Sequence, residues 1–316
     1  MPPLPQLQPI LAAVAAAPLH LLQELPVAQR RELIHAAMTP DDTITQPAPA
    51  SVAIRDIDLT VHGPVPGSVR LRVYTPPCGS PEQGFPANLF MHGGAWWMGT
   101  VEQTDAACGN LAALADCVVV SLDYRLAPEF PYPAALEDTV AAWQWLHANA
   151  ADLGVESARM SIGGESAGGN LAASACLLLR DRGLPMPVAQ VLTVPAPDYP
   201  SVDVYAHGYI LERSMLEEAI GLYLGDHGDA ADPYASPIRA ASLAGLPPAL
   251  VLTCEYDPVR DVGEAYARRL AEAGVDVQQH RADGLIHSSC GFTALLEEAR
   301  QIRAMTVDFL IDRHGA

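Results

Sequence analysis

The sequence predicts an α/β fold in which a mostly parallel central sheet carries helices on both faces. The first observation is an alternation of short apolar runs with helical patterns along most of the chain, which is typical of strands joined by crossover helices. The second is that these runs are apolar throughout, as expected for strands buried on both faces. The third is a long polar insertion between two of the runs, and insertions of that size are usually functional.

Two helical patterns occupy the first 45 residues. One runs over about 9–25 and is interrupted at Pro18, and the other runs over about 26–38. Pro26 is well placed to begin the second helix, because proline suits the first turn, where its missing N–H would have no partner. We expect two helices here, followed by a linker over 39–50.

A change to alternating hydrophobicity predicts two strands that pair antiparallel. Apolar residues occupy nearly every second position in 52–61 and again in 69–73, with a turn of proline and glycine between them. We therefore expect a hairpin before the parallel strands begin.

The rest of the chain alternates between strand and helix patterns. The apolar runs that predict strands are 87–91, 117–122, 160–162, 188–194, 249–254 and 275–280. The helical patterns lie near 103–115, 134–150, 168–181, 260–273 and 291–312. The insertion 198–245 is rich in Tyr, Asp and Pro and holds one helical piece, Ser214–Leu224, so we expect it to act as a lid.

Charge and composition exclude several classes of protein. Asp and Glu total 37 residues against 18 Lys plus Arg, which gives a formal net charge of −19, and all 18 basic residues are Arg. The absence of Lys excludes a P-loop lysine, a Schiff-base lysine and a Ser-Lys dyad. The negative charge argues against binding to nucleic acid or to anionic membranes, since both need clustered positive charge.

The six cysteines show neither a C-x-x-C pair nor the spacing of a zinc site, and we interpret those in apolar runs as buried free thiols. An apolar stretch spans Ile10–Ala17, but the basic residue that would precede it in a secretory signal is missing, the first being Arg30. No apolar run reaches the roughly 20 residues of a membrane-spanning helix. We expect a cytoplasmic protein without a metal and without stable membrane association.

The sequence Gly-Glu-Ser-Ala-Gly at 164–168 carries the first candidate for chemistry. It follows the apolar run 160–162 and opens a helical pattern, which is the context of a serine nucleophile on a sharp strand-to-helix turn. The small residues let strand and helix approach each other, and the helix N-terminus favours a developing negative charge. We predict that Ser166 is a nucleophile.

A His-Gly-Gly sequence at 92–94 directly follows the apolar run 87–91. Paired glycines leave backbone N–H groups free to point into a site, and acyl transfer needs such donors where the tetrahedral oxyanion forms. We predict an oxyanion hole made by the N–H groups of Gly93, Gly94 and Ala167. His92 itself is interpreted as a structural residue that holds the loop.

A serine nucleophile needs a base, and the base needs an acid that orients it. In hydrolases with such a serine turn, the chain order is serine, acid, histidine. Asp257 follows the run 249–254 and His287 follows the last run, so both lie at carboxyl ends of strands, where ligands bind in open α/β sheets. We predict a triad of Ser166, Asp257 and His287, with Asp261 and Glu255 as less favoured acids.

Together these motifs resemble the hormone-sensitive-lipase-like esterases, which are microbial carboxylesterases of the α/β-hydrolase fold. The resemblance extends over about 51–309. It rests on His-Gly-Gly at 92–94, Tyr-Arg-Leu-Ala-Pro-Glu at 124–129, the glycine-rich turn at 164–170, Asp-Pro-Val-Arg-Asp at 257–261, and His287.

The resemblance implies a domain organisation. Residues 46–197 and 246–316 would form the α/β-hydrolase catalytic domain, while 1–45 and the insertion 198–245 would form a helical cap. It also implies the triad and the oxyanion hole named above, without a cofactor. The segment 124–129 would support the wall of the active site.

Two places depart from the family pattern. Ala95 stands where a third glycine is common, which predicts a tighter pocket floor. Ser288 and Ser289 follow His287, where the family usually has Gly-Phe, and that pair occurs only at 291–292. We expect the loop that carries His287 to differ in shape.

The sequence therefore indicates a serine carboxylesterase that hydrolyses uncharged esters of short to medium acyl length through an acyl-enzyme intermediate. Its negative charge is expected to favour neutral or cationic esters over anionic ones. Activity is expected to fall as His287 becomes protonated, near or below the ordinary pKa of about 6.5. An amidase or arylformamidase on the same scaffold stays open, whereas the presence of His287 opposes a non-catalytic small-molecule receptor.

The expected partner is a small-molecule ester. Candidates for its pocket follow the oxyanion hole or lie in the insertion, and they are Trp96, Trp97, Tyr205, Tyr209 and Leu211. The two tryptophans are equally well interpreted as core residues. Similar enzymes commonly pair through the last strand and last helix, so a homodimer stays open.

Overall fold

The computed structural model describes residues 2–17, 24–37, 41–199, 205 and 209–315, and within them one sheet runs in the order β1-β2-β4-β3-β5-β6-β7-β8. The strands are β1 (Ala53–Val61), β2 (Gly67–Thr75), β3 (Phe85–Met91), β4 (Val118–Asp123), β5 (Val155–Glu165), β6 (Gln190–Thr193), β7 (Ala249–Tyr256) and β8 (Val277–Ile286). The helices are α1 (Gln8–Ala16), α3 (Val27–Ala37), α4 (Asp105–Leu114), α5 (Ala134–Ala148), α6 (Ala167–Asp181), α7 (Arg213–Leu224), α8 (Arg260–Glu272) and α9 (Glu297–His314).

The strand pairing confirms the mostly parallel sheet. The predicted hairpin forms, because β1 pairs antiparallel with β2 over its whole length, from Ala53 opposite Thr75 to Val61 opposite Gly67. β2 also pairs antiparallel with β4, and every other neighbouring pair is parallel. The carboxyl ends of β3, β5, β7 and β8 therefore meet at one edge of the sheet.

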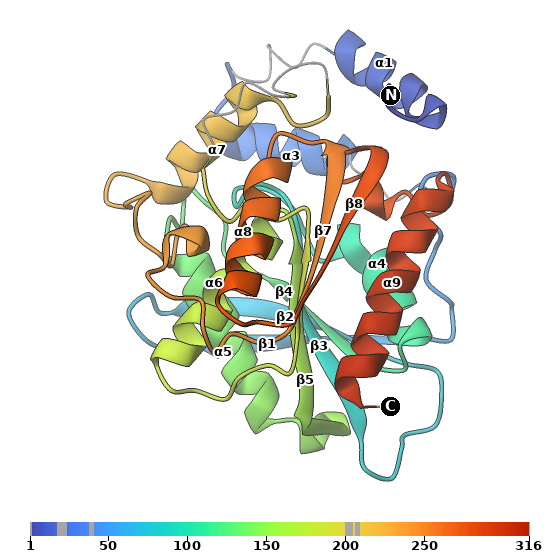
Figure 1. Cartoon of the computed structure of the whole chain (residues 1–316), viewed down its shortest axis with the longest axis vertical. Helices are drawn as coiled ribbons and strands as arrows, with labels where there is room; N and C mark the ends of the chain where they lie inside the picture. The colour runs from blue at the N-terminus through green and yellow to red at the C-terminus, as the bar shows by residue number, and fades with distance from the viewer. Residues whose placement is uncertain (1, 18–23, 38–40, 200–204, 206–208, 316) are drawn as a thin grey trace.

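Helices cover both faces of the sheet (Figure 1). α5, α6 and α8 pack on one face around a large apolar core that includes Leu171 and Leu270. α4 packs on the other face with α9, where Ala112 and Val307 share a smaller cluster. These two layers hold the strand ends in fixed positions.

The last strand and last helix differ from the prediction. β8 extends six residues beyond the predicted end because it keeps pairing with β7 past a bulge, up to Ile286 opposite Tyr256. A short 3-10 helix, Ser289–Gly291, follows, and α9 begins only at Glu297, six residues later than predicted. His287 therefore follows directly on the end of the strand.

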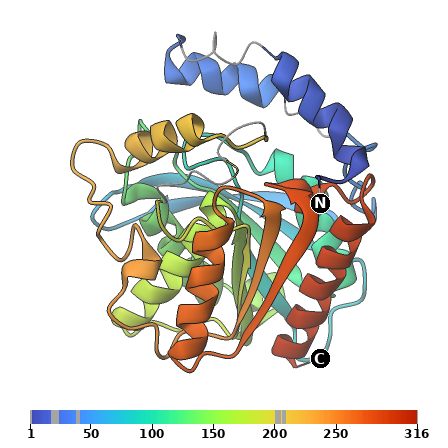
Figure 2. The same cartoon turned by 45° about the horizontal axis from the view of Figure 1, so that its top comes forward.

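Helices α1, α3 and α7 lie together at the carboxyl end of the parallel strands (Figures 1 and 2). α3 and α7 are joined by an ion pair between Arg30 and Glu218, at 2.6 Å. The first predicted helix is described as far as Ala17, and 18–23 lie outside the described residues. Within the described ranges, no helix is long and apolar enough to span a membrane.

Candidate active site

Ser166 occupies a strained turn between β5 and α6. Its backbone has φ 55° and ψ −114°, a conformation that is costly for a residue with a side chain. In this turn, the start of α6 comes very close to the end of β3. The approach needs a glycine at 168, because a Cβ there would overlap the carbonyl oxygen of Met91. The backbone N–H of Ser166 donates to the carbonyl oxygen of Thr193 at 2.9 Å, which fixes the turn to β6.

The structure brings the three predicted triad residues together. Nε2 of His287 lies 2.9 Å from Oγ of Ser166, and Nδ1 of His287 lies 2.7 Å from Oδ2 of Asp257. The residues are 8%, 5% and 2% exposed for Ser166, His287 and Asp257. Water therefore competes little with these hydrogen bonds, and the imidazole is held with one nitrogen on each partner.

The two less favoured acids point elsewhere. Asp261 forms an ion pair with Arg260, at 2.7 Å. Glu255 accepts a hydrogen bond from the backbone N–H of Gly284 at 2.7 Å. The second oxygen of Asp257 accepts from the N–H of Val259 at 2.9 Å, so this carboxylate is fixed by the turn that follows β7.

The pKa of His287 lies above its ordinary value of 6.5. Burial lowers this pKa, but the negative charge of Asp257, the hydrogen bond from His287 to Asp257 and the charge of Glu165 together raise it more. This direction differs from the expectation of a midpoint near or below 6.5, because the neighbouring Asp257 carboxylate stabilises the imidazolium. Burial also raises the pKa of Glu165, against a hydrogen bond with Ser288 and the charge of His287.

The loop after β3, which we call the oxyanion loop (92–99), turns back sharply on itself. Gly94 has φ 124°, and a Cβ there would overlap the carbonyl oxygen of Met98, so only glycine fits. His92 is buried, its Nδ1 lies 2.7 Å from the carbonyl oxygen of Gly93, and its ring stacks on Tyr124 at 4.2 Å between centroids. The structural role predicted for His92 agrees with these contacts.

The oxyanion loop faces the nucleophile. A Cβ built on Gly93 would lie 3.7 Å from the Cβ of Ser166. In the described part of the chain, the N–H groups of Gly93 and Gly94 donate to no backbone carbonyl. The N–H of Ala167 belongs to the first turn of α6, where helix N–H groups lack an intrahelical acceptor. An oxyanion hole made by the N–H groups of Gly93, Gly94 and Ala167 stays a prediction, and the approach of Gly93 to Ser166 is compatible with it.

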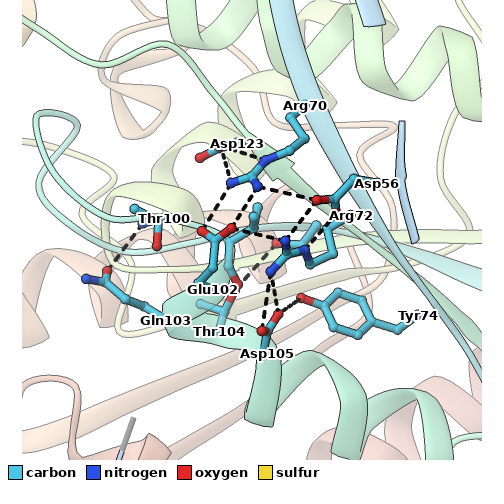
Figure 3. A network of polar contacts seen from close by, with 12 residues as sticks. Asp56, Arg70, Arg72, Tyr74, Thr100, Glu102, Gln103, Thr104, Asp105 and Asp123 are labelled. Atoms are coloured by element: carbon cyan, nitrogen blue, oxygen red, sulfur yellow. Dashed lines mark hydrogen bonds and ion pairs between the residues drawn. The ribbon is translucent and has the colours of Figure 1, made fainter. Parts of the chain in front are cut away.

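An ion-pair network fixes the segment that follows the oxyanion loop to strand β2 (Figure 3). Arg70 on β2 pairs with Glu102 at 2.7 Å and with Asp123 at 2.8 Å. Arg72, two residues along β2, pairs with Asp105 at the start of α4, at 3.2 Å. The loop is therefore fixed at both ends, by β3 and by this network.

Helix α3 contributes contacts that the sequence did not reveal. Arg31 donates from Nε to the carbonyl oxygen of Trp97 at 2.6 Å, and it pairs with Glu129 at 2.7 Å. Nε2 of His35 accepts the backbone N–H of Gly99 at 2.9 Å. No local sequence pattern marks these contacts, because they join residues more than 60 positions apart in the chain.

The candidates for the substrate pocket lie in two places. Trp96 is 1% exposed, stacks on Tyr223 of α7 at 4.6 Å between ring centroids and donates to Asn170 of α6 at 3.3 Å, so it packs between these two helices. Trp97 is also buried, at 5%.

The remaining pocket candidates come from the insertion. Tyr205 and Tyr209 contact Tyr256, which precedes Asp257, at 5.1 Å and 5.5 Å between ring centroids. Leu211 is partly buried against the main core. A substrate role for these residues stays a prediction.

Comparison with known proteins identifies similar chains. The family model described as alpha/beta hydrolase fold matches residues 88–291. The carboxylic ester hydrolase LipN of Mycobacterium tuberculosis (strain H37Rv) is 41% identical over 250 residues, which span 76% of this chain and 65% of LipN, slightly under two thirds. An ethyl acetate hydrolase of Pseudomonas putida is 37% identical over 262 residues, 81% of this chain and 82% of that protein.

A solved structure of an esterase has the same fold as this chain. The hyperthermophilic esterase from the archaeon Pyrobaculum calidifontis superposes with a TM-score of 0.87 and 37% identity, and the match covers 100% of both chains. The predicted fold class and the resemblance to α/β-hydrolase esterases are confirmed.

Proposed function

Because the chain belongs to the α/β-hydrolase family matched by residues 88–291, we propose that it is a serine carboxylesterase. The observation that carries this proposal is the series of hydrogen bonds from Ser166 through His287 to Asp257, at 2.9 and 2.7 Å. A serine so placed is activated by its histidine, and the aspartate holds the imidazole in the orientation and tautomer that catalysis needs. Similarity to a carboxylic ester hydrolase and an ethyl acetate hydrolase supports ester substrates.

The reaction proceeds through an acyl-enzyme. Oγ of Ser166 bonds to the ester carbonyl carbon while Nε2 of His287 takes the serine proton, and the carbonyl oxygen becomes an oxyanion. The bond from this carbon to the alcohol oxygen then breaks, and the alcohol leaves with the proton from His287. Water next attacks the acyl carbon as His287 takes one of its protons, and the acid leaves as Ser166 regains its proton.

The N–H groups of Gly93, Gly94 and Ala167 bind the oxyanion. Their contribution is large because they are fixed before the reaction starts, and removing one donor in such sites typically slows it about 10²- to 10³-fold. The net charge of −19 adds selectivity at longer range, since it disfavours the approach of anionic esters. We therefore propose uncharged esters as the substrates, and we expect acyl chains of short to medium length.

The proposal extends to the branch of the family, the cap, the cellular location and the oligomeric state. We propose that the chain belongs to the hormone-sensitive-lipase-like branch, with 1–45 and 198–245 as its cap. The position of α1, α3 and α7 above the strand ends supports this proposal (Figure 2). We propose a cytoplasmic location, because the six cysteines are free, among them the thiols of Cys254 and Cys290 at 3.3 Å, and a reducing compartment keeps thiols in this form.

The edge position of β8 would let two copies pair as a homodimer.

The test is hydrolysis of p-nitrophenyl esters with acyl chains of about 2 to 12 carbons by the parent chain and by Ser166→Ala. We expect the parent to prefer the shorter chains and Ser166→Ala to lose more than about 10⁴-fold in kcat. A matched anilide separates an esterase from an amidase. Full turnover by Ser166→Ala, or faster cleavage of the anilide than of the ester, would contradict the proposal.

A further inference from the structure

Helix α3 contacts the oxyanion loop at two backbone groups. Nε of Arg31 donates to the carbonyl oxygen of Trp97 at 2.6 Å, and the N–H of Gly99 donates to Nε2 of His35 at 2.9 Å. Positions 31 and 35 lie one turn apart on the same face of a helix. One side chain thus binds a carbonyl and the other an amide, on either side of Met98.

Gly99 lies directly against the peptide group that joins Gly93 to Gly94, since the carbonyl of Gly93 and the N–H of Gly94 share one plane. A Cβ built on Gly99 would overlap the carbonyl oxygen of Gly93 and the ring of His92. The turn is also closed from within, because the N–H of Met98 donates to the carbonyl oxygen of Gly94 at 3.0 Å. A displacement of Gly99 is therefore passed on to Gly93 and Gly94.

The segment after Gly99 is already fixed to the sheet. The N–H of Thr100 donates to the side chain of Gln103 at 3.3 Å, and Glu102 is held by Arg70 (Figure 3). The contact with α3 thus fixes the last residues of the oxyanion loop, between β3 and the ion pairs of Glu102.

His35 makes this contact only as the neutral imidazole, with its proton on Nδ1. The charged and titratable groups that act on it are Arg31 on its own helix, Asp123 at the end of β4 and His92 in the loop. Burial and the charge of Arg31 lower the pKa of His35, while Asp123, which is paired with Arg70, opposes them more weakly. The ring is therefore neutral at pH 7 and able to accept the hydrogen bond.

We propose that His35 is a positioning residue for the oxyanion hole, which acts through Gly99 on the N–H groups of Gly93 and Gly94. This inference rests on the proposed function. The oxyanion forms only during the reaction, so a misplaced hole lowers kcat while substrate binding changes little. A helix that merely covers the site would instead affect KM.

Two variants that differ by one methylene group test this role. In His35→Gln the amide oxygen reaches the position of Nε2 and accepts the Gly99 N–H, whereas in His35→Asn it is one bond too short. We expect kcat for p-nitrophenyl butyrate to fall about tenfold in His35→Asn with KM within about twofold, and kcat to stay within about twofold of the parent in His35→Gln. His62→Asn, at an exposed histidine, is the control and is expected to match the parent.

Equal kcat in the two His35 variants, whether high or low, overturns the positioning role. A loss in His35→Asn that falls on KM alone also overturns it, because it assigns to α3 a covering role only. If His35→Asn does not fold, His35→Met fills the same space without an acceptor of this kind and carries the same expectation. An inactive parent would refute the proposed function itself, and this inference with it.

Discussion

The floor and the roof of the active site are held in place by different forces. The floor comprises the strand ends and α6, which carry the triad, and the roof comprises α3 and α7. Thirteen of the 15 residues of α6 are buried, most of them apolar. Among the 11 residues of α3, all of them described, the only buried one is Arg30. Apolar burial fixes the floor and also α7, which buries Leu216, Ala219 and Tyr223, whereas charged and polar contacts hold α3.

This difference has consequences for how the molecule responds to change. Apolar burial depends little on salt or pH, while exposed and half-buried ion pairs are weakened by added salt. Segments with few buried apolar contacts also open locally at a lower free energy than the global unfolding. The floor should therefore set the chemistry, and α3 should open locally without disturbing the core.

The largest expected effect comes from the floor. Asp257→Asn keeps the shape of the side chain but removes the charge that orients and stabilises the histidine, so kcat should fall about 10⁴-fold. The thermal midpoint of unfolding should stay close to that of the parent, since the core around α6 is unchanged. Steady-state kinetics and thermal unfolding of the same preparations check both expectations.

Asp261→Asn is the matched control, four residues further along the chain. Asp261 pairs with Arg260 and makes no contact with His287, so its variant should keep kcat within about twofold of the parent. A comparable loss in both variants would refute the assignment of Asp257 as the triad acid.

A roof variant should separate activity from global stability. Arg31→Met keeps much of the side-chain length but loses the hydrogen bonds to the carbonyl oxygens of Trp97 and Ala127 and the ion pair with Glu129. Bonds from a charged donor are worth about 1.5–3 kcal/mol each, so we expect amide exchange in α3 to rise at least tenfold and kcat/KM to fall about tenfold. Hydrogen exchange by mass spectrometry resolves α3 from α6.

Arg268→Met provides the control for removal of a charge, because Arg268 is exposed on α8, away from the roof. It should leave exchange in both helices unchanged. If Arg31→Met instead increased exchange in α6 as much as in α3, roof and floor would form one cooperative unit and the distinction would fail.

The same division explains what could be predicted from the sequence. The floor was predictable because its parts are local: the turn around Ser166, the paired glycines after β3, and the apolar strands that precede Asp257 and His287. Chain order at a parallel sheet edge then brings them together.

The roof was not predictable, since its contacts join residues far apart in the chain through single polar side chains. Arg31 and Trp97 are 66 positions apart, and His35 and Gly99 are 64 apart. The end of β8 was misjudged for a related reason, as pairing with β7 carries it through a polar stretch with little strand pattern.

A smaller effect is expected on the pH dependence of kcat/KM, which the triad in the floor determines. The pKa of His287 is raised, so kcat/KM should fall as pH decreases through a midpoint above 6.5, where the imidazole loses its capacity as a base. Glu165→Gln removes one of the charges that raise this pKa, and the midpoint should move to lower pH.

Glu297→Gln, at an exposed carboxylate in the first turn of α9, should leave the midpoint in place. An unchanged midpoint in Glu165→Gln would mean that this carboxyl carries no charge beside the histidine.

The smallest expected effect is a response of the roof to salt. Arg30 is 4% exposed, but its partner Glu218 is 38% exposed, so added ions reach one side of the pair that joins α3 to α7. Such pairs contribute at most about 1 kcal/mol, and raising NaCl from about 0.05 M to about 0.5 M should therefore speed amide exchange in α3 by about two- to fivefold. Exchange in α6 should not respond, because apolar burial holds it.

Glu218→Gln should show the faster exchange already at low salt and a weaker response to added NaCl. If exchange in α3 does not respond to salt in either protein, its small apolar contacts hold this helix instead, through Val27 and Ile34 packed against the cluster that contains Trp97.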